Sequence, residues 1–236
     1  MNKVTLTIDG NQITVPSDLT VLEAAHEAGI KIPTLCYMKD ANEVGACRVC
    51  IVEIEGARSL AASCVQPVAD GMVVHTNSSK VRTTRKATLE LILSDHNSNC
   101  LECIRNKHCE LQTLADQYGI RQTPFKGTKS ISVPDTKSYS VQRDPSKCIL
   151  CGRCIAACNK QGIGVLSFIN RGFETKVGPA YDISMADAPC IYCGQCIIAC
   201  PVGALYEREV TEDVWDAIND PTKHVVIQTA PAVLAA

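Results

Sequence analysis

The cysteines of this 236-residue chain are the residues best suited to chemistry: there are 15 of them, in four groups of different spacing. Cysteine thiolates bind soft metals, act as nucleophiles or pair as disulfides. Because 15 is an odd number, complete intramolecular disulfide pairing is excluded, and free thiols in this number are typical of a reducing compartment. We therefore expect a cytoplasmic protein that folds around metal.

Two of the groups repeat the pattern C-x2-C-x2-C-x3-C, which begins at Cys148 and again 42 residues later at Cys190. In two-cluster bacterial ferredoxins, the fourth cysteine of such a run binds the other [4Fe-4S] cluster. One predicted cluster therefore has the ligands Cys148, Cys151, Cys154 and Cys200, and the other has Cys190, Cys193, Cys196 and Cys158. Cys200 precedes the usual Pro201 but Cys158 precedes Asn159, so we expect an altered backbone after Cys158 with the cluster retained.

A third group, Cys100, Cys103 and Cys109, is one ligand short of a [4Fe-4S] cluster. His96 completes the spacing H-x3-C-x2-C-x5-C and is the predicted fourth ligand. The rival His108 adjoins Cys109, and adjacent residues at a helix start rarely point toward the same metal. A neutral imidazole leaves the cluster less negative than four thiolates do. The other histidines are expected to be solvated or hydrogen-bonded: His26, His75, His108 and His224.

The first group along the chain has the spacing C-x10-C-x2-C-x13-C and consists of Cys36, Cys47, Cys50 and Cys64. Gly45 precedes Cys47 closely, and a glycine-containing loop lets backbone N–H groups approach the sulfurs of a [2Fe-2S] cluster. The first gap is longer than the x4 gap of plant-type ferredoxins. We therefore predict a variant [2Fe-2S] site, with a zinc site as the alternative.

The segments around this first group predict a small sheet crossed by a helix. Strands are expected over residues 4–8, 12–15, 49–53 and 72–75, with a helix over 20–28. Asp9-Gly10 is a typical hairpin turn. Ser17 or Asp18 is the expected helix cap, and Gly29 ends the helix. This order predicts the ubiquitin-like (β-grasp) sheet of plant-type ferredoxins.

The predicted fold class is α+β with a modular organisation. The expected parts are a [2Fe-2S] ferredoxin-like domain (1–78), a small helical domain for the His-ligated [4Fe-4S] cluster (79–124), a linker (125–140), a two-cluster bacterial ferredoxin-like domain (141–210) and a connector (211–236). In the connector, residues 225–228 are expected to form a strand. The apolar tail at 230–236 is interpreted as the start of a missing catalytic domain. A solvated helix face is expected for Lys80, Arg82, Arg85 and Lys86.

Fifteen cysteines and His96 supply enough ligands for one [2Fe-2S] and three [4Fe-4S] clusters. No thiol then remains for a nucleophile, and no catalytic residue is predicted. The net charge of -2 gives no indication of nucleic-acid binding, and no apolar run is long enough to span a bilayer. Neither G-x-G-x-x-G nor a P-loop occurs, so nucleotide cofactors are expected on partner subunits.

The order of these sites, together with the sequence outside the ligands, resembles the amino-terminal electron-relay region of [FeFe]-hydrogenases. The resemblance is carried by CILCGRCIAAC, FINRGFETKV, CGQCIIACPVGALYE and VWDAINDPTKHVVIQTAPAV. It is strongest to the large, catalytic subunit of multimeric NAD(P)-linked, electron-bifurcating hydrogenases, and it covers essentially the whole chain. The same order of sites also resembles relay subunits of complex I, of NAD-linked [NiFe]-hydrogenase diaphorases and of NAD-dependent formate dehydrogenases.

The resemblance implies an electron relay within an oxidoreductase that converts H2. The H-cluster is expected only in the missing domain, and FMN and NAD(P) are expected on partners. Those partners are a flavin/NAD(P)-binding iron-sulfur subunit, a small [2Fe-2S] subunit and ferredoxin. Two alternatives stay open: a complete relay subunit of a [NiFe]-hydrogenase diaphorase, formate dehydrogenase or complex I-like assembly, and a zinc-stabilised scaffold without a redox role.

Overall fold

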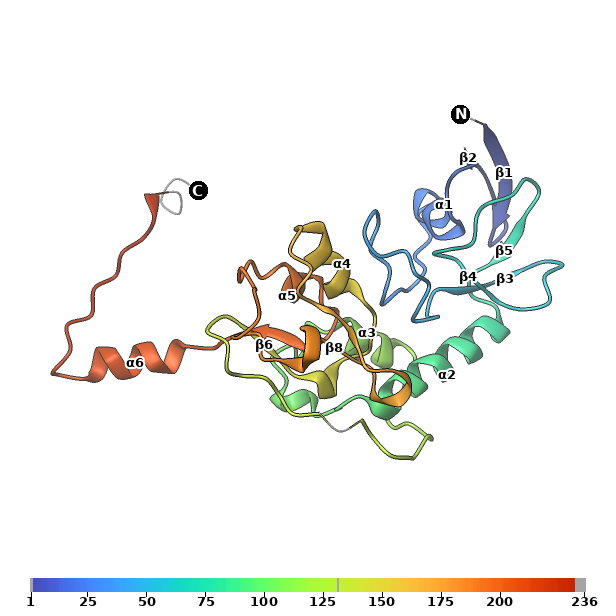
Figure 1. The fold of residues 1–236 in the computed structure, drawn as a ribbon. Coiled ribbons are helices and arrows are strands. Elements are labelled where there is room, and N and C mark those ends of the chain that lie inside the picture. Colours follow the sequence, from blue (N-terminus) through green and yellow to red (C-terminus); the bar gives the residue numbers. More distant parts are fainter. Residues whose placement is uncertain (1, 131, 232–236) are drawn as a thin grey trace.

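The amino-terminal part of the computed structural model is a five-stranded sheet crossed by a short helix (Figure 1). The structure describes residues 2–130 and 132–231. The strand order is β2-β1-β5-β3-β4, with β1 antiparallel to β2 and parallel to β5. The elements are β1 (Lys3–Ile8), β2 (Asn11–Pro16), α1 (Val21–Glu27), β3 (Ile51–Ile54), β4 (Ala61–Ala62) and β5 (Val73–His75). Helix α1 buries its apolar side chains in the same core as the sheet.

The predicted hairpin is confirmed, because Ile8 pairs with Asn11 across a two-residue turn. Asp9 and Gly10 both have positive φ, 49° and 84°, which is the backbone that a tight hairpin turn requires. The predicted helix cap was wrong. Thr20 caps α1 instead, since its side chain accepts a hydrogen bond from the Glu23 N–H while the Glu23 carboxylate accepts one from the Thr20 N–H.

Two α-helices and a short 3-10 helix follow the sheet: α2 (Ser79–Asp95), η1 (Cys100–Glu102) and α3 (Glu110–Gln117). Ser78 caps α2 by accepting a hydrogen bond from the Val81 N–H. The buried residues of α2 are Val81, Arg85 and Leu89, which succeed one another at intervals of four and so share one face.

Arg85 corrects the expectation of a solvated basic face, because it is only 3% exposed. Its guanidinium donates hydrogen bonds to the backbone carbonyls of Val49 (2.8 Å) and Ile51 (2.7 Å), which flank Cys50. It also donates to the Tyr118 hydroxyl at 2.8 Å. A buried guanidinium is tolerated where its donors are paired, so Arg85 ties α2 to the loop that carries Cys50.

Replacing Arg85 by methionine is expected to lower the free energy of unfolding by about 2–5 kcal/mol, because buried carbonyls lose their donors. Urea unfolding of the anaerobic, metal-loaded protein, followed by circular dichroism, measures the change. Arg82→Met is the matched control: Arg82 is exposed on the same helix, and its loss is expected to change stability by less than about 0.5 kcal/mol. Equal effects of the two substitutions would contradict this role of Arg85.

The carboxyl-terminal part contains two small antiparallel sheets and two short helices arranged as a repeat. Its elements are β6 (Val141–Arg143), η2 (Pro145–Lys147), α4 (Arg153–Lys160), β7 (Ser167–Ile169), η3 (Gly172–Glu174), β8 (Lys176–Gly178), η4 (Ala180–Asp182), α5 (Gln195–Ala199) and β9 (Leu205–Glu207). Gly152 and Gly194 precede α4 and α5 with φ of 79° and 71°, a conformation that favours glycine.

The two halves of this repeat differ where Asn159 replaces proline. Helix α5 ends at Ala199, and Cys200 lies at its C-cap before Pro201. Helix α4 continues through Cys158 and Asn159 to Lys160, because asparagine retains the backbone N–H that proline lacks. The altered backbone predicted after Cys158 is confirmed.

One buried cluster connects all parts of the fold that carry cysteines. It includes Leu35 and Val49 from the first part, Leu89 and Leu111 from the helical part, and Leu166 from the repeat. The sheet and α1 have a second cluster of their own. Since a shared core resists relative movement of the parts that contribute to it, the cysteine groups are held in a fixed arrangement.

The segment predicted as a linker is fastened to both of its neighbours. Ser130 donates hydrogen bonds from its N–H and hydroxyl to the Asp95 carboxylate at 2.7 and 2.6 Å. Asp135 accepts hydrogen bonds from the Ser184 hydroxyl and the Met185 N–H at 2.6 and 2.7 Å, and its backbone pairs with Arg143. These contacts connect the end of α2 with the repeat.

Helix α6 (Thr211–Asn219) extends away from the rest of the chain and exposes Val214, Trp215 and Ile218 (Figure 1). The strand expected at 225–228 was wrong: these residues have no secondary structure, since no strand of the described ranges pairs with them. Part of the apolar tail, 232–236, lies outside the described residues. Among residues 2–130 and 132–231, no helix is both long and apolar enough to cross a membrane.

Candidate metal centres

All 15 cysteines carry free thiols, and all of them except Cys193 are buried or partly buried. Within the described ranges, no three His, Cys, Asp or Glu side chains converge closely enough to hold one metal ion. The sulfurs around an iron-sulfur cluster bind different iron atoms. Cysteines that hold one cluster therefore need to be neighbours, but their sulfurs need not converge on a single point.

In the first group, Cys36, Cys47 and Cys50 lie in the segment between α1 and β3, and Cys64 follows β4. The Cys50 and Cys64 sulfurs are 3.3 Å apart, and the Cys47 N–H donates to the Cys36 sulfur at 3.5 Å. Cys36 also contacts the Cys47 and Cys64 thiols. Three of the four, Cys36, Cys50 and Cys64, are 1% exposed. The structure thus brings all four predicted ligands together.

Hydrogen bonding within this group divides the thiols into two kinds. Hydrogen bonds from Cys47 and Cys64 hold the pKa of Cys36 far below its usual value, and a hydrogen bond from Cys64 lowers the pKa of Cys50 to about 6. The same bonds raise the pKa values of Cys47 and Cys64. Hydrogen bonding within the group thus favours the thiolate form of Cys36 and Cys50 and the thiol form of Cys47 and Cys64.

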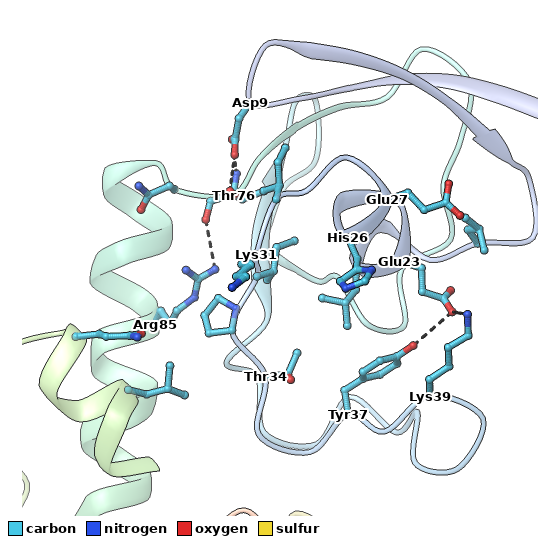
Figure 2. Close-up of a pocket in the computed structure, with 18 of the residues that line it drawn as sticks. Asp9, Glu23, His26, Glu27, Lys31, Thr34, Tyr37, Lys39, Thr76 and Arg85 are labelled. Atoms are coloured by element: carbon cyan, nitrogen blue, oxygen red, sulfur yellow. Dashed lines mark hydrogen bonds and ion pairs between the residues drawn. The ribbon is translucent and has the colours of Figure 1, made fainter. Parts of the chain in front are cut away.

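A cavity of about 1070 Å³ lies between α1, the segment that follows it and α2, and Tyr37, the neighbour of Cys36 in the sequence, is one of the residues that line it (Figure 2). Figure 2 shows Tyr37, which follows Cys36, donating to the Glu23 carboxylate, with Lys39 paired to the same carboxylate at 3.5 Å. Burial and the nearby Glu23 charge raise the pKa of Tyr37. These contacts fix the start of the cysteine loop on α1.

Cys148, Cys151, Cys154 and Cys200 line one small cavity in the repeat. The Leu150 N–H donates to the Cys148 sulfur at 3.4 Å. Burial raises the pKa of Cys148 to about 11 and that of Cys151 to about 12, and neighbouring thiolates add to both shifts. Without metal these groups are therefore protonated near neutral pH. The fourth cysteine of the second run thus lies with the first three of the first run.

The other half of the repeat has the reciprocal arrangement. Burial raises the pKa of Cys196 to about 12, and the nearby charges of Cys190, Cys158 and Cys193 raise it further. These three cysteines are therefore neighbours of Cys196. The Tyr192 N–H donates to the Cys190 sulfur at 3.4 Å, as Leu150 does to Cys148. Cys193 is exposed.

His96, Cys100 and Cys109 line a cavity of about 710 Å³ at the end of α2. The charges of Cys103 and Cys100 contribute to the raised pKa of Cys109, after burial, so the three cysteines are neighbours. His96 is the C-cap of α2 and is 8% exposed. Its Nδ1 atom is buried and has no hydrogen-bond partner among the described residues, and burial lowers its pKa. A neutral, unpartnered imidazole nitrogen is suited to metal binding.

The His96 group packs directly against the repeat. A Cβ at Gly203 would lie 2.6 Å from the Cys103 sulfur, so only glycine fits at this position. The Arg105 guanidinium donates to the Ile197 carbonyl at 2.7 Å, and the Glu110 N–H donates to the Pro201 carbonyl at 3.0 Å. The loop from Cys200 to Gly203 therefore touches the His96 group.

Asn42 and Arg85 are the residues near the cysteines that sequence reasoning missed. The Asn42 side-chain amide donates to the Cys36 carbonyl at 2.7 Å and to the Cys151 carbonyl at 3.0 Å. Asn42 and Cys151 are 109 positions apart, so no local pattern indicates their contact. The regular i, i+4 spacing of Val81, Arg85 and Leu89 was the one available signal for Arg85.

Three family models match successive parts of the chain. They are a 2Fe-2S iron-sulfur cluster binding domain (residues 1–79), an NADH-ubiquinone oxidoreductase-G iron-sulfur binding region (85–124) and a 4Fe-4S dicluster domain (147–204). Together with the cysteine groups, these matches define a modular iron-sulfur protein with 2Fe-2S and 4Fe-4S binding regions.

Similar proteins extend along nearly all of the chain. NADP-reducing hydrogenase subunit HndD of Solidesulfovibrio fructosivorans is 49% identical over 100% of this chain and 41% of its own length. Iron hydrogenase 1 of Clostridium pasteurianum is 38% identical over 98% of this chain and 41% of its own length. NAD-reducing hydrogenase HoxS subunit gamma of Cupriavidus necator is 32% identical over 89% of both chains. The chain belongs to this family of iron-sulfur hydrogenase subunits, as the sequence resemblance predicted.

A solved structure agrees with this assignment. A chain of an NAD+-reducing [NiFe]-hydrogenase in the H2-reduced state has a TM-score of 0.81 and 31% identity, covering 87% of both chains. The two hydrogenases first named above are considerably longer, since this chain spans 41% of each.

Proposed function

We propose that the chain is the electron relay of an NAD(P)-linked hydrogenase. The proposal is supported by the neighbouring positions of the cysteines within each predicted set, and of His96 beside Cys100 and Cys109. The proposed [2Fe-2S] ligands are Cys36, Cys47, Cys50 and Cys64. The proposed [4Fe-4S] ligand sets are His96, Cys100, Cys103 and Cys109; Cys148, Cys151, Cys154 and Cys200; and Cys190, Cys193, Cys196 and Cys158.

Bound clusters of these types take up and release single electrons at potentials set by charge, hydrogen bonding and solvent exposure. The chain controls each of these. Backbone N–H groups of Cys47, Leu150 and Tyr192 donate to ligand sulfurs, which favours the more negative, reduced state. Burial of Cys36, Cys50 and Cys64 excludes water from the first site.

The proposed partners follow from the family. We infer a flavin- and NAD(P)-binding iron-sulfur subunit, a small [2Fe-2S] subunit and ferredoxin as electron donors or acceptors. The H-cluster that converts H2 would lie outside these 236 residues, because all 15 cysteines are assigned to the relay. This proposal is supported by the match to HndD over the full chain.

A second candidate is the relay subunit of an NAD-linked [NiFe]-hydrogenase. The specific observation in its favour is that HoxS subunit gamma and the solved structure match this chain over 89% and 87% of their own lengths. Nickel analysis of the complex purified with this chain separates the two candidates. Stoichiometric nickel would favour the second, and an H2-converting complex that contains iron alone would favour the first.

The first test is metal content. Anaerobically purified protein is expected to contain about 14 iron atoms and a matching amount of acid-labile sulfide per chain, the total for one [2Fe-2S] and three [4Fe-4S] clusters. Elemental analysis and EPR spectroscopy after dithionite reduction measure these. Zinc in place of iron would refute the relay and support a zinc-stabilised scaffold.

A further inference from the structure

Asn42 links two of the proposed cluster sites through one side chain. Its amide nitrogen donates to the carbonyl of Cys36, a proposed [2Fe-2S] ligand, and to the carbonyl of Cys151, a proposed [4Fe-4S] ligand. An amide nitrogen has two hydrogens, and both are used here. Asn42 is 6% exposed, so these hydrogen bonds are shielded from water.

The surroundings of Asn42 hold this side chain in place. Its backbone exchanges two hydrogen bonds with Met38, at 3.0 and 2.8 Å, which form a tight turn independent of the side chain. Gly152 faces the amide: a Cβ there would lie 3.4 Å from Asn42 Oδ1, and its φ of +79° favours glycine. Asn42 and Gly152 therefore pack closely against each other at this junction.

We propose that Asn42 is a positioning residue that couples the [2Fe-2S] site to the site of Cys148, Cys151, Cys154 and Cys200. The proposal rests on the proposed function. A continuous path runs from Cys36 through its carbonyl, the Asn42 amide and the Cys151 carbonyl, with two hydrogen bonds and otherwise covalent bonds. With both clusters bound, one electron would pass between the two sites along this path, oxidising one site and reducing the other, and no bond would form or break.

This junction is distinct from the contact made by the His96 group. That group meets the repeat at Gly203 and Ile197, through Cys103 and Arg105. Asn42 takes no part in those contacts. Loss of the Asn42 amide is therefore expected to affect exchange with the [2Fe-2S] site and to leave exchange with the His96 group unchanged.

The test compares Asn42→Leu and Asn42→Ala with wild type in the anaerobic, cluster-loaded protein. Leucine retains much of the side-chain volume without a donor, and alanine removes the side chain while the Met38 turn keeps its backbone bonds. After photoreduction, electron equilibration between the two sites is expected to be measurably slower than in wild type, because the two hydrogen bonds that join Cys36 to Cys151 are lost. The magnetic interaction between the two reduced clusters in EPR is expected to weaken in parallel. Asn77→Leu, at an exposed asparagine, is the matched control and is expected to behave as wild type.

Unchanged equilibration and magnetic interaction in both variants would overturn the proposal. Loss of [2Fe-2S] iron from both variants would also overturn it, because the side chain would then act on cluster retention and not on coupling. Failure of the proposed function is distinguishable, since wild-type protein would then lack the clusters in the first place.

Discussion

Cys200→Ala is expected to remove the cluster of Cys148, Cys151 and Cys154, although Cys200 is far from them in sequence and close to Cys196. The reason is the cavity that these three share with Cys200. Loss of one thiolate leaves three ligands, and the cluster loses its iron in part or whole. Elemental analysis is expected to show a fall of up to about four iron atoms per chain.

Double substitutions make this crossing of ligands measurable. Cys148→Ala with Cys200→Ala is expected to cost no more than about four iron atoms, because both residues serve one cluster. Cys190→Ala with Cys200→Ala is expected to cost up to about eight, because the two serve different clusters. The reverse result would assign Cys200 to the run in which it lies and would contradict the crossed arrangement. Ser146→Ala, at a residue that binds the Asp144 side chain, controls for handling losses.

The sequence predicted those features that depend on neighbouring residues. The β1–β2 hairpin followed from Asp9-Gly10, and the altered backbone after Cys158 followed from Asn159. The cap of α1 was misplaced because Ser17, Asp18 and Thr20 are all good capping residues. Only the reciprocal contact with Glu23 selects Thr20.

The features that sequence reasoning missed depend on contacts between distant parts of the chain. Arg85 belongs to a basic run typical of a solvated face, and its burial depends on the carbonyls of Val49 and Ile51. The hydrogen bond from Asn42 to the Cys151 carbonyl spans 109 positions of the chain. Conversely, residues 225–228 have the composition of a strand, but composition cannot supply the partner that a strand requires.

His96→Ala is expected to abolish the EPR signal of one [4Fe-4S] cluster and to leave the other signals unchanged. The buried Nδ1, which has no hydrogen-bond partner within residues 2–130 and 132–231, and the shared cavity with Cys100 and Cys109 support His96 as the fourth ligand. Iron is expected to fall by between about one and four atoms per chain, since a cluster with three ligands loses either the unbound iron or all of its iron.

Two further substitutions separate ligation from packing. His108→Ala, at the exposed rival, is expected to leave the spectrum unchanged, and a loss of the same signal there would transfer the ligand role to His108. His96→Cys is expected to retain the cluster but to lower its reduction potential, because a thiolate replaces a neutral imidazole and disfavours the added electron. A purely structural His96 would give the opposite pattern: cysteine would fit the space no better than alanine, and the potential of any retained cluster would not change.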